Sequence, residues 1–111
     1  MSKKSATKNE SKNAYVEYKC EGEQYNYSGR IYLEHSNTFG KVTSVPVSVT
    51  IDDLITIKGC HYKYTDKNAW VEFPEYKSGD EYKSFFYFAE GMNNDLNAIA
   101  KAIGDAVNKT T

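Results

Sequence analysis

Lysine and aromatic side chains alternate along the middle of this 111-residue sequence, a pattern that suits nucleic-acid binding. Aromatic rings offer flat surfaces on which bases stack, at about 1–3 kcal/mol per base, while lysines follow the phosphate backbone. The candidate contact residues are Lys58, His61, Lys63, Tyr76, Lys77 and Lys83, interleaved with Tyr62, Tyr64, Lys67 and Trp70. The alternative is that half of these rings lie in the core and that the lysines form an ordinary solvated surface.

Residues that could support catalysis are present, but they are not grouped in a recognisable motif. His35 and His61 do not have the spacing of a helical metal pair. The adjacent acids at 52–53 and 80–81 fall in turn-like segments, where carboxylates usually face water. Phosphate-binding loops and dinucleotide fingerprints are missing. We therefore expect a binding module with no cofactor and no metal site, and not an enzyme.

The charge balance leaves the class of binding partner open. The chain carries 14 lysine or arginine residues and 15 acidic ones, a net charge of −1. Residues 1–13 are basic, with four lysines and one glutamate, so the remainder is acidic. A domain that relies on phosphate contacts is usually basic. A protein partner is therefore the alternative to DNA or RNA, as for a phage-encoded or mobile-element inhibitor or adaptor with an acidic, tyrosine-rich surface.

Composition favours a single cytoplasmic domain. The sequence is 40% hydrophobic and 14% aromatic, and its length suits one globular domain. Cys20 and Cys60 are far apart and read as reduced thiols, with a disulfide between them left open. No segment has the apolar character of a secretory signal or a membrane span. We expect residues 1–13 to form a flexible basic tail and 14–111 to form the domain.

Short aromatic and β-branched segments separated by turns predict an antiparallel sheet of five to six strands. Residues 14–28 belong to a first hairpin, with Gly29 as a candidate bulge, and residues 30–89 make up the sheet. Alternation is clearest at 45–51, where three valines and an isoleucine alternate with polar residues. Pro46 interrupts this strand's hydrogen bonding, which predicts either an edge strand or a break in the ladder.

In the strand after the Asp-Asp turn at 52–53, the large apolar residues change from odd-numbered to even-numbered positions. Ile55 and Ile57 share one face, whereas Cys60, Tyr62 and Tyr64 fall on the opposite parity. A bulge at Lys58-Gly59 would return all of them to one face, and glycine is the usual residue at such a bulge. The later segment 81–91 reads as a long aromatic strand that is apolar on both faces near 85–88.

Beyond residue 92 the apolar period changes from two to about 3.6, which predicts a helix over 93–108. One face carries Leu96, Ile99, Ala100, Ile103 and Val107, and a flank of small residues carries Ala98, Ala102 and Ala106. A helix of this length is not stable alone in water, so it must pack on the sheet. The predicted fold class is α+β, a twisted antiparallel sheet with one C-terminal helix.

The order of these signals from about Arg30 to Val107 resembles the SpoVG family of small bacterial proteins. The resemblance is carried by three short elements in nearly gapless order: Ile51-Asp52-Asp53, then Trp70-Val71-Glu72-Phe73-Pro74, then Asp80-Glu81-Tyr82-Lys83. It covers about two thirds of the chain, and the hairpin before residue 30 is an addition to it.

The resemblance implies a twisted antiparallel sheet with a C-terminal helix, a homodimer formed through the sheet, and a regulator that binds DNA or RNA. The chain departs from the family pattern at two places. The serine and basic residues that usually follow the proline are displaced, since Glu75 and Tyr76 come before Lys77. The basic position of the second strand falls on His61, whereas Lys83 keeps the match in the last strand.

Overall fold

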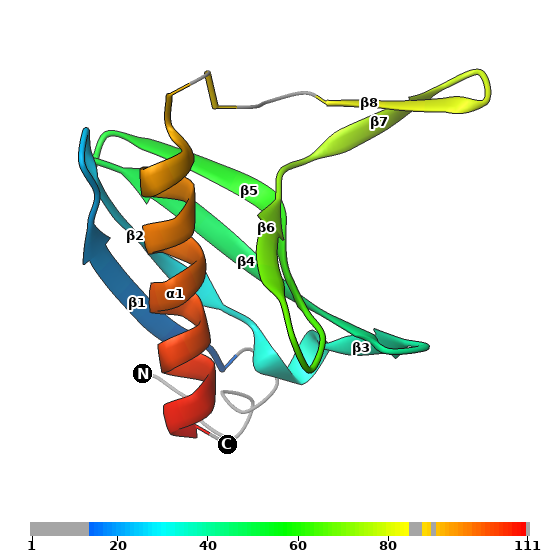
Figure 1. The fold of residues 1–111 in the computed structure, drawn as a ribbon, viewed down its shortest axis with the longest axis horizontal. Coiled ribbons are helices and arrows are strands. Elements are labelled where there is room, and N and C mark those ends of the chain that lie inside the picture. Colours follow the sequence, from blue (N-terminus) through cyan, green and yellow to red (C-terminus); the bar gives the residue numbers. More distant parts are fainter. Residues whose placement is uncertain (1–13, 85–87, 90, 111) are drawn as a thin grey trace, which may run out of the picture.

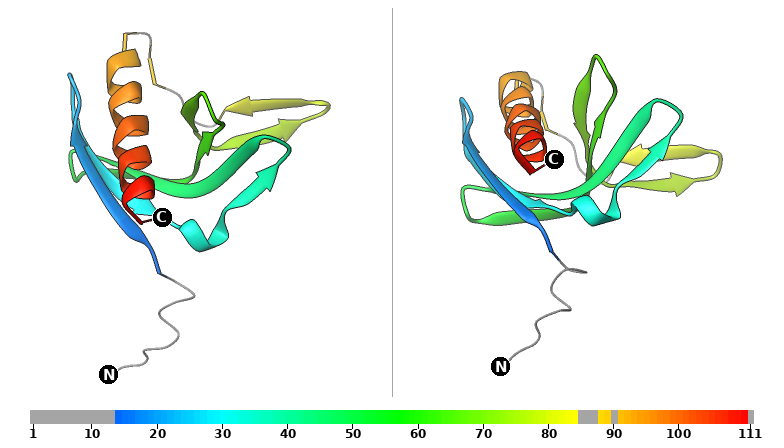
Figure 2. Two further views of the ribbon diagram at one scale, coloured as in Figure 1. Left: turned by 60° about the horizontal axis from the view of Figure 1, so that its bottom comes forward. Right: turned by 90° about the horizontal axis from the view of Figure 1, so that it is seen from below.

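A computed structural model describes residues 14–84, 88–89 and 91–110. The predicted α+β class is confirmed: the described chain forms a six-stranded antiparallel sheet, a small two-stranded sheet and one C-terminal α-helix. The sheet curves around the helix, which covers one of its faces, while no described element covers the other face (Figures 1 and 2). None of the helical segments described combines the length and apolar character that a membrane crossing requires.

The large sheet has a simple antiparallel order. Its strands, in spatial order, are β1 (Val16–Glu21), β2 (Asn26–Ile31), β4 (Val42–Ile51), β5 (Ile55–Tyr64) and β6 (Ala69–Glu72), and β3 (Asn37–Phe39) pairs with the first part of β4. A 3-10 turn, η2 (Leu33–His35), connects β2 to β3. The second sheet consists of β7 (Glu75–Ser78) and β8 (Glu81–Ser84), and the helix α1 spans Asn93–Thr110.

The core lies between the curved sheet and α1, on the faces that the periodicity predicts. Val45, Val47 and Val49 of β4 are buried, as are Ile99 and Ile103 of α1. Each such side chain contributes about 1.5–3 kcal/mol through burial. The helix therefore forms because its apolar face is covered, and the predicted stripe is confirmed.

The bulge predicted at Lys58-Gly59 is confirmed. Val49 pairs with Ile57, but Val47 pairs with Cys60, so two residues of β5 stand opposite Ser48 alone. Gly59 has a φ of 82°, a left-handed conformation that costs glycine little. Because of the extra residue, Ile57 and Cys60 both lie in the core, although strict alternation along the strand would place them on opposite faces.

Pro46 breaks a ladder inside the sheet, so the predicted break is confirmed and the edge position is wrong. On one side of β4, β2 is paired as far as Ile31 opposite Val47, and β3 pairs from Asn37 opposite Ser44 onward. The proline lies between these two ladders, where a missing N–H removes no strand hydrogen bond.

Gly29 makes room for a tyrosine and is not a bulge. The β1–β2 register is continuous, with Gly29 opposite Tyr18. A Cβ at position 29 would lie 2.0 Å from the Ser48 carbonyl oxygen and 2.8 Å from the Tyr18 ring. The Tyr18 hydroxyl donates to that carbonyl at 2.8 Å, and the Arg30 N–H donates to Ser48 Oγ at 3.0 Å. The Ser48 hydroxyl thus helps to join β2 to β4 here, and the Tyr18 hydroxyl joins β1 to β4.

Asp95 fixes the first turn of α1 to the turn between β1 and β2. Its carboxylate, 1% exposed, accepts hydrogen bonds from the Tyr27 hydroxyl at 2.7 Å and from the N–H groups of Glu23 at 2.6 Å, Gln24 at 3.1 Å and Tyr25 at 3.3 Å. Because a buried carboxylate is costly unless its oxygens are satisfied, this arrangement determines where the helix begins on the sheet.

The expected continuation of the sheet through residue 89 is wrong. β7 and β8 pair only with each other. The hairpin they form, residues 75–84, extends away from the large sheet and α1, which together we call the body (Figure 1). We call this hairpin the arm. The expected long aromatic strand ends at Ser84 as β8, and residues 85–87 lie outside the described residues. Phe88 returns to the body, where its ring stacks at 5.1 Å from that of Phe73.

Candidate nucleic-acid interface

The six predicted contact residues fall into two groups. Lys58, His61 and Lys63 alternate along β5 with the core-facing residues and therefore point to the sheet face away from α1. Tyr76, Lys77 and Lys83 lie on the arm. The six residues are thus divided between the sheet face and the arm and do not form one surface.

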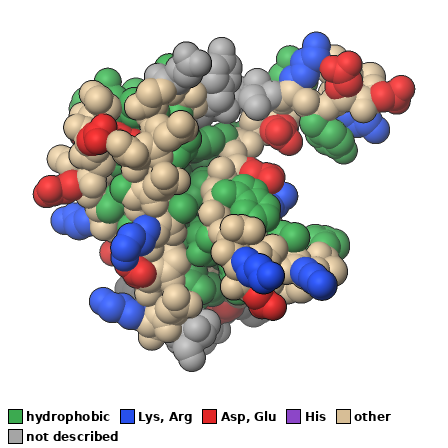
Figure 3. Space-filling view, in the orientation of Figure 1, with side chains coloured by type: hydrophobic (Ala, Val, Ile, Leu, Met, Phe, Trp, Pro, Cys, Tyr) green, Lys and Arg blue, Asp and Glu red, His purple; other side chains and the backbone are tan. Residues whose placement is uncertain are grey.

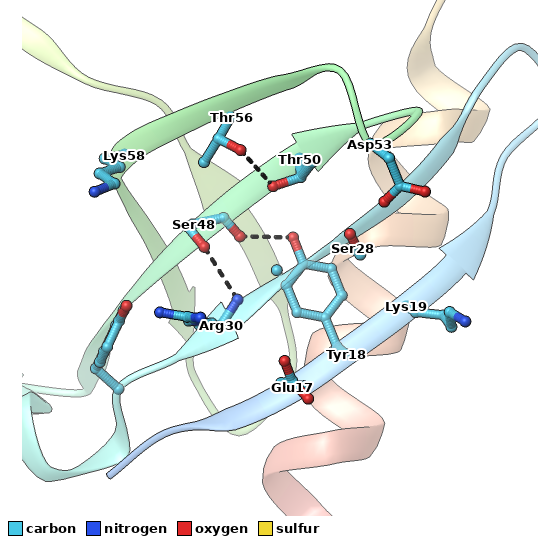
Figure 4. A pocket seen from close by; sticks show the side chains of 12 residues that line it. Glu17, Tyr18, Lys19, Ser28, Arg30, Ser48, Thr50, Asp53, Thr56 and Lys58 are labelled. Atoms are coloured by element: carbon cyan, nitrogen blue, oxygen red, sulfur yellow. Dashed lines mark hydrogen bonds between the residues drawn. The ribbon is translucent and has the colours of Figure 1, made fainter. Parts of the chain in front are cut away.

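The uncovered sheet face is hollowed into an open-face groove (Figure 4). Four strands and their connections line it, with Glu17, Tyr18, Lys19, Ser28, Gly29, Arg30, Tyr32, Ser48, Thr50, Asp53, Thr56 and Lys58. Three cations from three different strands, Lys19, Arg30 and Lys58, line the groove together with two carboxylates and several hydroxyls. Ammonium, guanidinium and hydroxyl groups are the usual protein ligands of phosphate oxygens.

Lys19 and Arg30 were not among the predicted contact residues. Their position follows from the hairpin register, in which Arg30 lies opposite Glu17 and Lys19 lies opposite Ser28. Strand alternation places all four on the face opposite Tyr27. The signal that would have found them is this register, which depends on where the β1–β2 turn falls.

Arg30 also belongs to an aromatic cluster at the side of the groove. Its guanidinium lies 4.3 Å from the centre of the Tyr15 ring, and that ring packs edge-to-face on Tyr32 with the centroids 6.0 Å apart. Tyr15 is 42% exposed. A cation held beside an exposed ring is a suitable surface for a stacked base next to a phosphate.

Lys63 is already paired, which weakens its predicted role. Its Nζ lies 2.7 Å from Glu72 Oε1, and the Trp70 indole N–H donates to the other carboxylate oxygen at 3.0 Å. Burial by itself would raise the pKa of Glu72, but the hydrogen bonds from Lys63 and Trp70 lower it below its usual value. The positive charge of Lys63 is therefore largely balanced within the protein.

Two rings of the predicted surface belong to the body. Tyr62 is 6% exposed and is part of the core, and the half-buried Tyr64 packs beside it with the centroids 5.5 Å apart. Of the rings for which the alternative places half in the core, Tyr62 is thus a core residue, whereas Tyr64 and Trp70 are only half-buried. Lys67 is exposed in the turn between β5 and β6.

The arm pairs each of its tyrosines with a lysine. Tyr76 lies opposite Lys83, and Lys77 lies opposite Tyr82. Because directly opposite residues of an antiparallel pair project to the same side, each face of the hairpin carries one ring and one cation. Tyr82 is 69% exposed. Carboxylates share the arm, and basic and acidic side chains alternate over its surface (Figure 3).

A small hollow connects the arm to the β5 group. It is lined by Gly59, His61, Glu72, Phe73, Pro74, Glu75 and Tyr82. The predicted residue His61 and the exposed ring of Tyr82 therefore border the same depression, at the point where the arm leaves the body. Glu72 and Glu75 add negative charge to it.

Metal and thiol chemistry find no geometric support in the part of the chain that the structure describes. No group of three His, Cys, Asp or Glu residues there is arranged to hold a metal ion. Cys20 and Cys60 are free thiols. Burial raises the pKa of Cys60 to about 12, so this thiol stays protonated and unreactive at neutral pH.

Comparison with known proteins finds no match: no family model, no curated protein and no solved structure is similar to the chain.

Proposed function

We propose that this protein is a non-enzymatic, SpoVG-like regulator that binds DNA or RNA in the cytoplasm and acts as a homodimer. The observation that carries the proposal is the meeting of Lys19, Arg30 and Lys58, from three strands, in a groove that no described element covers. The three cations outnumber Glu17 and Asp53 in the groove, so its lining is positive although residues 14–111 as a whole are acidic.

The dimensions of the groove suit a nucleic-acid backbone. β1 and β5 are separated by β2 and β4, and neighbouring strands lie 4.7–4.9 Å apart, so the groove spans about 14 Å from β1 to β5 along the sheet. Successive phosphates of one strand are offset by about 3.4 Å along the axis of a duplex and lie further apart through space. More than one phosphate therefore fits across the groove, within reach of its cations and hydroxyls.

The arm supplies stacking surfaces outside the groove. Its two Tyr–Lys pairs combine a ring and a cation on each face, the combination that single-stranded nucleic acid recognition uses without sequence readout. The small hollow that His61 and Tyr82 line adjoins β5, the strand that also carries Lys58 of the groove.

Fluorescence anisotropy with single- and double-stranded DNA and RNA at low salt tests the proposal. We expect the double variant Arg30→Ala/Lys58→Ala to lose at least tenfold in affinity and to reduce the slope of log K against log salt by about 1.4–1.8, because two phosphate contacts are lost. Lys41→Ala, which removes an equally positive and exposed side chain near β3, is the matched control. No binding by the wild type at tens of micromolar would overturn the proposal.

The basic N-terminal segment needs its own control, since four lysines and one glutamate give it the largest local excess of positive charge in the sequence. Replacing its four lysines with glutamine in the full-length chain separates the two sources of binding. We expect most of the affinity, and all of the effect of Arg30→Ala/Lys58→Ala, to persist. Binding that disappears with these lysines alone would assign it to the segment and not to the groove.

A protein partner is the second candidate, and the arm favours it. Glu75, Asp80 and Glu81 share the hairpin with the exposed ring of Tyr82, which suits an inhibitor or adaptor that docks on a basic protein surface. The salt series separates the candidates. A steep loss of nucleic-acid affinity with salt supports the first, whereas no nucleic-acid binding together with capture of a protein through the arm supports the second.

A further inference from the structure

The outer edge of β1 is open. β1 is the last strand of the large sheet in the order β1-β2-β4-β5-β6, and no described strand pairs with its outer side. An exposed edge of six residues presents unpaired N–H and C=O groups and readily accepts another strand. Next to this edge runs a groove between β1 and α1, lined by Val16, Glu17, Tyr18, Lys19, Cys20, Glu21, Ala98, Lys101, Ala102, Asp105, Ala106 and Lys109.

We infer that a second copy of the chain occupies this edge, with the two β1 strands antiparallel about a two-fold axis through Tyr18. In that register Glu17 of each copy lies opposite Lys19 of the other, which gives two ion pairs on the face away from α1. Val16 of each copy lies opposite Cys20 of the other on the core face. Opposite charges and apolar pairs placed directly across strands each stabilise a sheet.

The sequence of β1 selects this register over its neighbour. Centring the axis on Lys19 instead would set Glu17 opposite Glu21 of the second copy, twice, and like charges directly opposite are destabilising. It would also shorten the overlap of the two strands. The charge pattern of β1 is thus complementary to its own reverse, which is the property that a two-fold interface requires and that an unrelated peptide does not.

The small-residue side of α1 is also compatible with this two-fold pairing of β1 strands. The axis is perpendicular to the sheet, so both copies of α1 lie on one face and run antiparallel. Ala98, Ala102 and Ala106 line the groove beside β1, and helices pack at about 8–10 Å when the contact residues are small. Lys101 and Asp105, which pair within one helix at 2.9 Å, are also complementary across such an axis.

The inference specifies the interface of the homodimer in the proposed function, and its test needs no nucleic acid. Residues directly opposite in an antiparallel pair have Cα atoms about 4.5–5.5 Å apart, within disulfide range. Val16→Cys in the full-length chain should therefore form a disulfide with the native Cys20 of the second copy under mild oxidation. Within one chain, positions 16 and 20 are separated by about 13 Å along the strand and cannot bond.

The expected result is a covalent dimer as the main product on a non-reducing gel, with the 16–20 linkage identified by mass spectrometry. Val16→Cys/Cys20→Ser should stay monomeric on that gel, and Lys41→Cys, an exposed position distant from β1, reports random collision. A Val16→Cys yield no higher than that of Lys41→Cys would overturn the inference.

A charge exchange provides the second measurement. By sedimentation, Lys19→Glu should weaken dimerisation at least tenfold, and Glu17→Lys/Lys19→Glu should restore it, because the exchange rebuilds both ion pairs. A wild-type monomer at 100 micromolar contradicts the inference, as does a dimer that neither variant affects. If nucleic-acid binding fails while the dimer and its charge exchange hold, the proposed function is wrong and the interface stands.

Discussion

The body and the arm differ in whether burial explains their residue types. In the body, Tyr27, Ile31, Ile99 and Ile103 are almost completely buried, and burial explains why these residue types occur where they do. In the arm every strand residue whose exposure is described is exposed, including Tyr82. An isolated two-stranded hairpin is only marginally stable in water. Burial therefore does not explain the tyrosine at position 82, whose exposed ring is available to contact another molecule.

The comparison also separates two kinds of polar residue. Asp95 in the body is surrounded by donors of its own chain, whereas the charged residues of the arm and of the open-face groove, such as Lys19, Arg30 and Lys58, are exposed. The first kind should determine stability with no direct effect on binding. The second should determine binding with little effect on stability.

The largest effect is expected from Asp95→Ala. The substitution leaves the Tyr27 hydroxyl and the N–H groups of Glu23 and Gln24 without their acceptor, and it frees the β1–β2 turn from the helix. We expect a loss of about 3–5 kcal/mol in the free energy of unfolding, measured by urea denaturation. Asp105→Ala, which removes an exposed carboxylate of the same helix, should cost less than about 1 kcal/mol. Equal losses would show that Asp95 has no special structural role.

The same carboxylate should produce an acid dependence of stability. Burial alone would raise the pKa of Asp95, but hydrogen bonds from the Tyr27 hydroxyl and the N–H groups of Gln24, Glu23 and Tyr25 lower it below the ordinary value. A lowered folded-state pKa means that the unfolded chain binds the proton more tightly. The contribution is therefore complete above about pH 4–5 and is lost as the pH falls through the folded-state pKa. Unfolding curves between pH 7 and pH 2 should show this loss, and Asp95→Asn should reduce it.

The next effect concerns the hydrogen bond that connects Tyr18 of β1 to Ser48 of β4. Tyr18→Phe removes the hydroxyl that donates to the Ser48 carbonyl but keeps the ring over Gly29. Since the carbonyl is buried and loses its donor, we expect a loss of about 1–2 kcal/mol by urea denaturation. Tyr25→Phe, at a tyrosine that is 48% exposed, is the control and should change stability by less than about 0.5 kcal/mol.

Much of the body could be predicted because its signals are local. The valine alternation of β4, the parity change at Lys58-Gly59 and the apolar stripe of α1 each depend on neighbours within ten residues. The role of Asp95 could not be predicted in this way. Its partners lie about 70 residues earlier, and an acid in the first turn of a helix is common for electrostatic reasons alone.

The candidate site was only partly predictable, for the same reason. Alternation along β5 places Lys58 outward, but the pairing of Lys63 with Glu72 depends on the β5–β6 register. The contribution of Arg30 to the groove depends on the register of the first hairpin. The arm has the composition of any short hairpin, so nothing local indicates that residues 75–84 leave the sheet.

The smallest effect on stability, and the sharpest test of the division, is expected in the arm. Tyr82→Ala removes a ring that is 69% exposed, so the free energy of unfolding should change by less than about 0.5 kcal/mol. If the ring stacks on a base, the same variant should lose about 1–3 kcal/mol of binding, or roughly 5- to 150-fold in affinity for single-stranded nucleic acid. Phe39→Ala, at an exposed ring on β3, is the matched control and should change neither quantity. A Tyr82→Ala variant that is destabilised yet binds normally would show that the arm serves the fold after all.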